Sequence, residues 1–456
     1  MYEKARSQAT ATPLLRAIPL NKVFDFRSAS DTLTDARQNP DIAAPAVFRA
    51  VFHGFLFRFS SFQQLESELA TPAFQRWIDA DRCFGDDVLR YSLCGFDLSR
   101  LETMLVQINR TLKRNKALDP GRVQGRIVAA LDGVEVLSSF SRCCETCLER
   151  LIRCPQPDGS IAERIQYYHR FVGCQIVSSP LKPLLALEWV QPGEGEDTAA
   201  LRLFERMGEL YGPRFFDILL LDSLYAQAPV LRLLDRLRWD AVITFKQERR
   251  DLYQDALGLF QTRSADLVFE HQREGIQRRV QLWHAADLPF TRDYPRLVGV
   301  VHSQEEVTRQ KIRGGQPYKQ TTLQRWCWIS TLNDKVFPAP LIWQLGHLRW
   351  KNENNGWNDL TQNWALKHGF LHACRHRPQA TSADGKPHPV PTRGLAAVVL
   401  ILSLAFNLFS AFVLLHSKLF RRDHPTLIEV ARQLYRSVDK RPPPIRSPGD
   451  GSPASS

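Results

Sequence analysis

The chain is poor in cysteine for its length, and two common targeting or cofactor signals are missing. Its nine cysteines in 456 residues are too few and too unevenly spaced for the disulfide framework of a small secreted protein. Residues 1–20 contain no continuous apolar core of the kind that a signal peptide needs. No glycine-rich phosphate-binding loop is visible to indicate the use of ATP. These absences favour a protein of the reducing cytoplasm.

The composition is that of a folded protein with an excess of basic residues. Hydrophobic residues make up 44% of the chain and charged residues 24%, which predicts packed cores and about two to four structural units. Lys and Arg number 60 against 48 Asp and Glu, for a net charge of +12. Such a balance suits a polyanionic partner, because each cation set against a phosphate releases counterions. Ordinary solubility charge is the alternative.

One segment raises the question of a membrane. Residues 394–415 run for 22 residues without a charge, which is long enough to cross a bilayer. A buried core helix is also apolar on all sides, and Asn407 within the run would be costly in lipid. We therefore predict a buried helix, with a membrane anchor as the alternative.

Changes in patterning along the chain predict its domain organisation. Between residues 126 and 246, three short apolar strands, a helix, a strand, a helix and a strand follow one another, which is the element order of an RNase H-like domain. The predicted fold class is α/β, with a mixed five-stranded RNase H-like core, a helical N-terminal domain and a β-rich insertion. The predicted regions are a helical region at 1–118 for DNA binding or dimerisation, the first part of the core at 119–246, the insertion at 247–335, the helical C-terminal part of the core domain at 336–422, and a largely disordered tail at 423–456.

Two acids stand at the ends of apolar strands. Asp132 closes the run RIVAALD, and Asp222 closes FFDILLLD. The two strands lie side by side in an RNase H-like sheet, so both carboxylates are expected to share one cleft. Two carboxylates that close repel each other unless a cation lies between them, and Mg²⁺ or Mn²⁺ accepts such ligands. A loop aspartate that merely follows a strand is the alternative for each.

A third acid is needed to complete a metal site for phosphodiester chemistry, and Glu353 in RWKNENNGW is the candidate. If this segment is helical, Arg349 and Trp357 share a face with Glu353, because both are four residues away. An arginine one turn from the acid can bind a phosphate or steady the carboxylate. A solvated surface glutamate is the alternative.

These segments resemble the DDE transposases of bacterial insertion sequences, in the subgroup with a β-rich insertion before the catalytic Glu. The resemblance lies in ALDGVEVLSS, LLLDSLYAQAPVLRLLDRL, RWKNENNGWNDLTQNWALKH and IQYYHR, and it covers roughly residues 50–415. It implies that the catalytic acids are Asp132, Asp222 and Glu353, with Arg349 as the accompanying arginine. Two positions depart from the family: Gly346 stands where a Tyr is frequent, and Leu360 where a Lys is frequent.

The resemblance implies an enzyme that cuts DNA at transposon ends with the help of Mg²⁺ or Mn²⁺ and transfers the cut strand into target DNA. Its expected partners are the terminal inverted repeats, the target DNA and a second copy of the chain in a homodimeric synaptic complex. A cytoplasmic, nucleoid-associated location is expected, and the apolar helix is expected to pack on the catalytic domain. Two alternatives stay open: a DNA nuclease without strand transfer, and a catalytically decayed DNA-binding derivative.

Further candidates for DNA binding flank the predicted insertion. Lys246 and the pair Arg249 and Arg250 follow the last predicted core strand, beside the expected active site, although a solvated loop is the alternative. Tryptophans of the insertion can stack on an unpaired base, while core packing is the more frequent role. These tryptophans are Trp283, Trp326 and Trp328.

A group of cysteines suggests a second, structural metal. Cys144 and Cys147 have C-x-x-C spacing, and Cys154 or His169 would complete a thiolate–imidazole set for Zn²⁺. Similar members of the resembling family carry a C-x-x-C followed by Tyr-Tyr-His in this region. Buried free cysteines are the alternative.

Overall fold

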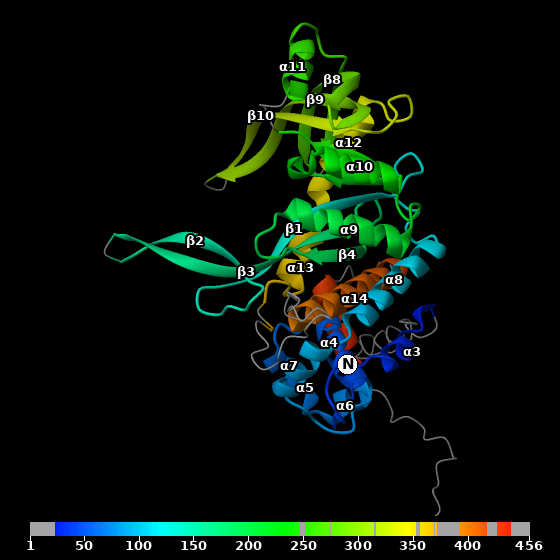
Figure 1. The fold of residues 1–456 in the computed structure, drawn as a ribbon, viewed down its shortest axis with the longest axis vertical. Helices are drawn as coiled ribbons and strands as arrows, with labels where there is room; N and C mark the ends of the chain where they lie inside the picture. Colours follow the sequence, from blue (N-terminus) through cyan, green and yellow to red (C-terminus); the bar gives the residue numbers. More distant parts are fainter. Residues whose placement is uncertain are drawn as a thin grey trace, which may run out of the picture. The chain divides into compact units, whose positions relative to one another are not determined.

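The computed structural model describes residues 23–157, 159–246, 251–273, 275–313, 316–352, 356–368, 370–371, 393–416 and 426–438. Figure 1 shows the fold with the element labels used below. Contacts divide the chain into two compact units. The first combines Met1–Leu101 with Arg393–Ser456, and the second is Glu102–Thr392.

The first unit is helical and draws its helices from both ends of the chain. Two of its helices begin where a side-chain oxygen caps the first turn. Ser61 Oγ accepts the N–H of Gln64 at 3.1 Å, and Thr71 Oγ1 accepts the N–H of Phe74 at 3.3 Å. The helices are α3 (Phe26–Asp31), α4 (Ala44–Leu56), α5 (Phe62–Leu69), α6 (Pro72–Ile78), α7 (Asp86–Gly95), the start of α8 (Leu98–Arg114), α14 (Arg393–Leu415) and α16 (Leu427–Arg436).

The apolar segment forms α14, which contacts α4 and α7. Among the described helices it alone is long and apolar enough to cross a membrane, but 78% of its most apolar window is buried inside the protein. Asn407 is buried as well, and Ser403 donates its hydroxyl to the carbonyl of Val399 at 2.7 Å. The helix thus forms the core of the helical unit. The sequence analysis assigned it to the catalytic domain, whereas its contacts group it with α4 and α7 in the first unit.

The tail after residue 422 is not wholly irregular, contrary to the predicted disorder of 423–456. Helix α16 begins at a Thr426 cap and buries Val430 and Leu434. Tyr435, at its end, packs its ring 5.5 Å from that of Phe57 and donates its hydroxyl to Glu68. An amphipathic helix hidden in a polar sequence accounts for the difference.

The second unit is built on one large sheet. Strand β1 (Val128–Ser139) pairs in parallel with β5 (Ile218–Leu221), and β5 pairs in parallel with β6 (Asp240–Thr244). On the other side of β1, β3 (Ile161–Ile176) is antiparallel and carries β4 (Leu184–Trp189). The order is therefore β4–β3–β1–β5–β6. The helical elements between these strands are α9 (Glu196–Tyr211), η1 (Ser223–Tyr225) and α10 (Ala228–Leu237).

One strand of this region was absent from the sequence prediction. Strand β2 (Leu148–Pro155) pairs with the first half of β3, so four strands rather than three precede α9. The second half of β3 pairs with β1. In Figure 1, β2 and the start of β3 form a two-stranded arm that extends away from the sheet. The alternating exposure of β2 fits such an arm, since neither of its faces is fully covered.

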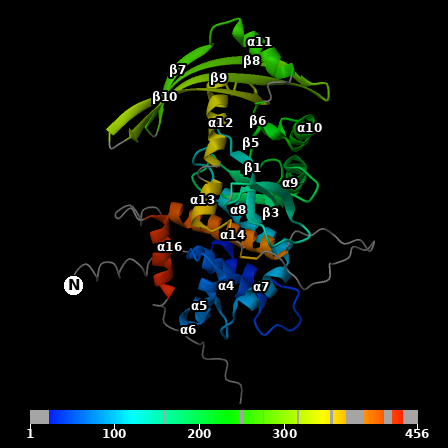
Figure 2. The ribbon, with the colours of Figure 1, turned by 90° about the vertical axis from the view of Figure 1, so that its left-hand side faces the viewer.

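The β-rich insertion continues the same sheet. Helix α11 (Asp251–Gln261) comes first, and the strands β7 (Leu267–Arg273), β8 (Ile276–Thr291), β9 (Tyr294–Arg313) and β10 (Gln316–Ser330) follow. The last part of β10 pairs antiparallel with β6. In Figure 2, the four strands curve over α12 (Ala339–Asn352), which runs from them toward β5 and β1.

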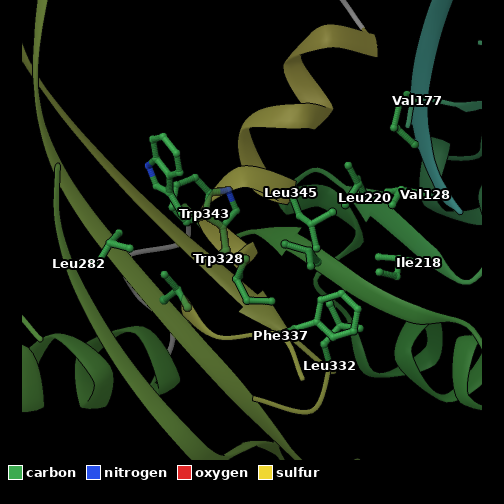
Figure 3. Packing of buried hydrophobic residues seen from close by; sticks show 14 of the residues in the cluster. Val128, Val177, Ile218, Leu220, Leu282, Trp328, Leu332, Phe337, Trp343 and Leu345 are labelled. Carbon is green, nitrogen blue, oxygen red and sulfur yellow. The ribbon is translucent and has the colours of Figure 1, made fainter. Parts of the chain in front are cut away.

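The insertion and the core strands also share a hydrophobic cluster (Figure 3). Val128 and Leu220 come from the core, Leu282 and Trp328 from the insertion, and Leu345 from α12. Removing this apolar surface from water is the main force that joins the two parts. The insertion is consequently part of the same folded unit and not a separate domain.

A buried carboxylate fastens α12 to the insertion. Glu305 on β9 is fully buried, and its Oε1 accepts hydrogen bonds from the Trp343 indole at 2.9 Å and the His347 ring at 2.8 Å. Ser303 donates to the same oxygen, and Arg278 donates to Oε2 at 3.1 Å. Burial alone would raise the pKa of Glu305, but these hydrogen bonds lower it. The carboxylate therefore sets the position of α12 and of the residues at its C-terminal end.

Candidate active site

The two predicted aspartates stand at equivalent positions on neighbouring strands. In the parallel pairing of β1 and β5, Val128 is opposite Ile218 and Ala130 is opposite Leu220. Continuing this register by two residues places Asp132 opposite Asp222, at an interstrand spacing of about 4.8 Å. Asp222 directly follows β5 and accepts the N–H of Leu224 at 2.8 Å. The Asp132 side chain is 22% exposed.

Glu196, the first residue of α9, places a third carboxylate next to Asp132. A Cβ atom on Gly133 would lie 1.8 Å from Glu196 Oε2, so Glu196 packs directly over the residue that follows Asp132. Its Oε1 accepts a hydrogen bond from Arg170 Nη2 in an ion pair of 2.7 Å. Burial raises the pKa of Glu196; Arg170 opposes this rise, and the charge of Asp222 adds to it. The sequence analysis missed Glu196, because the acidic start of α9 looks like an ordinary helix entry.

Tyr225 is a buried residue on which the charges of all three acids act. Its ring is buried, and its hydroxyl has no hydrogen-bond partner among the described residues. Burial raises the pKa of Tyr225 well above its ordinary value, and the charges of Glu196, Asp222 and Asp132 raise it further. Three carboxylates close enough to act on one hydroxyl form a strongly negative cleft.

Two arginines border this cleft. Arg349, in the last turn of α12, places Nη1 3.7 Å from Asp132 Oδ2, and its side chain is only 8% exposed. Within the described part of the chain, the Nε–H groups of Arg349 and Arg170 have no acceptor. A buried guanidinium with an unused N–H beside an acid is suited to bind a phosphate oxygen, since the planar group can donate to two oxygens at once.

Glu353 lies outside the described residues, but the positions four residues before and after it are described. Four residues before it, Arg349 lies beside Asp132, with Nη1 3.7 Å from Oδ2. A Cβ on Gly173 would lie 2.5 Å from the ring of Trp357, and Gly173 is the β3 partner of Asp132. Trp357 is buried, with its ring 5.6 Å from that of Phe171. Trp357, predicted as a DNA contact, therefore packs in the core, just before α13 (Asn358–Asn363).

The departures from the resembling family have a steric basis. A Cβ at Gly346 would lie 2.2 Å from Trp328 Nε1, so the buried indole leaves no room for the Tyr that is frequent there. Leu360 is buried, at 1% exposure, and a Lys at this site would have to bury its charge. Neither position can supply a phosphate contact here.

The predicted DNA-binding cations and tryptophans differ in their surroundings. Arg249 and Arg250 lie outside the described residues, and Lys246 is exposed. The Lys246 ammonium lies 5.9 Å from the ring centre of Trp326 and 5.7 Å from that of Trp350. Trp328 is buried, and Trp283 donates its indole N–H to the carbonyl of Arg263 at 3.3 Å. Trp326 is thus the tryptophan of the three that borders an exposed cation.

The predicted zinc ligands are brought together only in part. Cys144, Cys147 and His169 converge, with their ligand atoms all within 4.8 Å of one another. Cys154 does not belong to this group: it lies in β2, and its thiol contacts the carbonyl of Ile152 at 3.9 Å. A strand advances about 3.3 Å per residue, so seven residues of largely extended chain carry Cys154 far from Cys147.

Comparison with known proteins gives one family match. Residues 149–357 match the family model described as "Transposase DDE domain". The match covers just under half of the chain, includes Asp222 and position 353, and begins after Asp132. No curated protein sequence matches the chain significantly.

A solved structure of the piggyBac transposase, in a synaptic complex with hairpin DNA, is similar over 94% of this chain and 80% of that one. The identity is 10% and the TM-score 0.39, which is too low to establish a common fold. The support for the kind of protein therefore comes from the family match. Through residues 149–357, it supports a DDE-type transposase.

Proposed function

We propose that the chain is a transposase that cleaves DNA at the ends of its own mobile element and transfers the cut strand into target DNA. The observation that carries this proposal is the parallel register of β1 and β5, which, continued by two residues, sets Asp132 level with Asp222, together with Arg349 beside Asp132. We propose Glu353 as the third catalytic acid. The active form is proposed to be a homodimer that joins two inverted repeats in the cytoplasm, at the nucleoid.

The strand arrangement supports an RNase H-like core. The order β4–β3–β1–β5–β6 has β1, β5 and β6 parallel and β3 antiparallel to β1. These five strands belong to a ten-stranded sheet, and their order and directions are those expected of the proposed core. Asp222 directly follows β5, and Asp132 lies level with it on β1, although β1 itself continues to Ser139.

The side chains at this edge fit a hard divalent cation. Asp132 and Asp222 offer carboxylate oxygens, which are the ligands that Mg²⁺ and Mn²⁺ prefer. Without a cation, the negative charges of neighbouring carboxylates oppose one another. Burial chiefly raises the pKa of Glu196, and the charge of Asp222 adds to the rise. Bound here, the ions would activate the attacking oxygen and stabilise the leaving oxygen of the phosphodiester.

The protein's own groups supply position and charge. Arg349 and Arg170 aim guanidinium groups at the cleft and are proposed to hold the scissile phosphate through their unused N–H groups. Because Arg349 is buried, its position depends on α12 and on the Glu305 contacts that fasten this helix. The same acids serve strand cleavage and strand transfer, and no covalent intermediate between protein and DNA is needed.

The identity of the third acid is the first thing to test. DNA carrying the element's own ends, incubated with Mg²⁺, is expected to be nicked by the natural protein and not by Glu353→Gln. Glu196→Gln is the matched control, since it removes the other acid that neighbours the pair. It is expected to retain nicking within about tenfold, because removing a neighbouring charge shifts electrostatics without removing a ligand. The reverse pattern would assign the role to Glu196.

If neither variant nor the natural protein nicks DNA while all three bind the ends, the transposase proposal fails in favour of a decayed DNA-binding protein. Nicking without joined products on paired ends would indicate a nuclease. The assay therefore needs both paired ends and a target duplex.

A basic face on the insertion is proposed to hold the DNA backbone. Side chains alternate along a strand, so Arg309, Lys311 and Arg313 of β9 share one face. All three are exposed. Cross-strand pairing puts Arg273 on the same face, which also carries the buried Glu305 and packs against α12. This helix carries Arg349 near its C-terminal end, so the basic face and the acids are linked by one element.

Replacing Arg309, Lys311 and Arg313 together by Gln is expected to weaken binding to duplex DNA. Each lost phosphate contact lowers the slope of log affinity against log salt by about 0.9, so the slope is expected to fall by two to three. The measurement is a binding titration at several salt concentrations. Its control replaces three exposed basic residues on the opposite face of the same strands, and equal loss in both variants would refute the proposed face. These control residues are Arg279, Lys319 and Arg325.

A further inference from the structure

Three side-chain atoms near the base of the β2–β3 arm have the spacing of metal ligands. The two sulfurs of Cys144 and Cys147 are 3.6 Å apart, and His169 Nε2 lies 3.3 Å and 3.5 Å from them. Tetrahedral zinc, with Zn–S bonds of about 2.3 Å and Zn–N bonds of about 2.0 Å, requires S···S separations of about 3.8 Å and S···N separations of about 3.5 Å. The three observed separations agree with these values to within about 0.2 Å, which is the usual tolerance for such a site.

The local backbone holds the two sulfurs in this arrangement. The N–H of Cys147 donates to the carbonyl of Cys144 at 3.1 Å, which closes a tight turn. The N–H of Cys144 donates to Cys147 Sγ at 3.3 Å. An N–H directed at a sulfur stabilises negative charge on it, and the thiolate is the form that binds a metal.

The third atom comes from a rigid strand. His169 lies on β3, paired with Leu137 of β1, and is 2% exposed. Trp189 packs against its ring edge to face, with the centroids 6.2 Å apart. The imidazole is thus held in place while its Nε2 faces the two sulfurs. Neutral imidazole with two thiolates is a donor set that selects zinc over the hard cations of the acidic cleft.

We propose that Cys144, Cys147 and His169 bind a structural Zn²⁺ at the base of the β2–β3 arm. The ion would tie the loop between β1 and β2 to β3, at the point where β3 passes from its pairing with β2 to its pairing with β1. The bound ion would fix the base of the β2–β3 arm beside Leu137 of β1, which is five residues after Asp132. This proposal does not depend on the proposed function.

The fourth position of the tetrahedron is assigned to a water molecule. Cys144 is only half-buried, so one side of the group is open to solvent. Cys143 is exposed, and its sulfur is not among the atoms that converge. The Cys143→Ser variant is accordingly expected to keep its metal, and loss of zinc from it would overturn the assignment of three protein ligands and a water.

Metal content is the direct test. Full-length protein prepared with zinc and exchanged into metal-free buffer is expected to hold about one zinc per chain, measured by mass spectrometry of the element. Cys147→Ser and His169→Ala are expected to hold less than about a tenth of that amount, because two ligands do not retain the ion through the exchange. Cys154→Ser is the matched control and is expected to stay at the natural value.

Two further measurements keep the test independent of folding defects in these variants. His169→Cys, which supplies another zinc ligand, is expected to retain the ion. The natural protein loaded with Co²⁺ is expected to show the charge-transfer absorption of thiolate ligands, and a chelator is expected to lower its melting temperature. Natural protein without zinc, a disulfide between Cys144 and Cys147 in its place, or equal zinc loss from Cys154→Ser would overturn the proposal.

Discussion

Asp132→Asn and Asp222→Asn are each expected to reduce DNA nicking by on the order of 10³-fold or more, which corresponds to about 4 kcal/mol in the activation barrier. The reason is geometric: the register of β1 and β5 brings the two carboxylates to one spot, and the amide is a poor ligand for a divalent cation. DNA binding is expected to persist, since neither substitution removes a positive charge. The measurement is single-turnover nicking of end-containing DNA at several Mg²⁺ concentrations.

The same two variants, although expected to lose nicking activity, are expected to lose no thermal stability. Because the acids repel each other without a cation, removing one negative charge is expected to leave the melting temperature in metal-free buffer equal to or above that of the natural protein. Asp217→Asn is a matched control at the other end of β5, where the side chain accepts the N–H of Ile127 at 2.8 Å. It is expected to nick DNA at the natural rate; a loss as large as that of Asp222→Asn would contradict the site.

Glu305→Ala is expected to lower the free energy of unfolding by about 3–5 kcal/mol, the usual cost of removing one partner from a buried ion pair. Glu305 is fully buried, and its loss leaves Arg278 and the indole N–H of Trp343 without their acceptor. Nicking is expected to fall as well, because α12 holds Arg349 at Asp132. Denaturant unfolding and nicking rates measure the two effects.

Glu306→Ala provides the control for this change. Glu306 is the next residue on β9, but it is exposed and points to the opposite face. It is expected to change the free energy of unfolding by less than about 0.5 kcal/mol.

The lowered pKa of Glu305 also predicts that the stability of the protein depends on pH. Its stabilising contribution is present above the ordinary pKa of a glutamate and is lost as the pH falls through the lowered folded-state value.

The acids at strand ends could be found from the sequence because the evidence for them is local. A continuous apolar run such as Ile218–Leu221 predicts a fully buried strand, and the first polar residue after it marks the strand's end. Adjacent pairing of two such strands then follows from the element order. For this reason Asp132 and Asp222 were singled out without any knowledge of contacts. Asp222 does follow the end of β5, whereas β1 continues past Asp132 to Ser139, so the predicted strand end at Asp132 is wrong.

Glu196 and the arrangement of the cysteines could not be found in that way. Glu196 reaches the cleft only because α9 packs over Gly133, more than sixty positions earlier in the chain, and no local pattern encodes that contact. Cys154 looks like a fourth ligand by spacing alone. The unpredicted strand β2 carries it away from Cys147, since extended chain separates residues that a compact loop would keep together.

The contacts of α14 with α4 and α7 could not be read from the sequence for a related reason. Its sequence shows that it must be buried, because it is apolar on all sides, but any apolar surface can bury it. The faces that do so belong to α4 and α7, more than 290 residues away along the chain.

This arrangement has a consequence for how the protein is made. The ribosome releases α4 and α7 first, while the helix that covers their apolar faces is synthesised more than 290 residues later. Until then, the N-terminal helices expose surface that favours aggregation or binding by chaperones. A product ended by a stop codon or frameshift before residue 393 would keep Asp132 and Asp222 but lack α14, and proteases should remove it. Only a chain translated through α14 would then persist, which would keep products truncated before this helix from competing with longer ones.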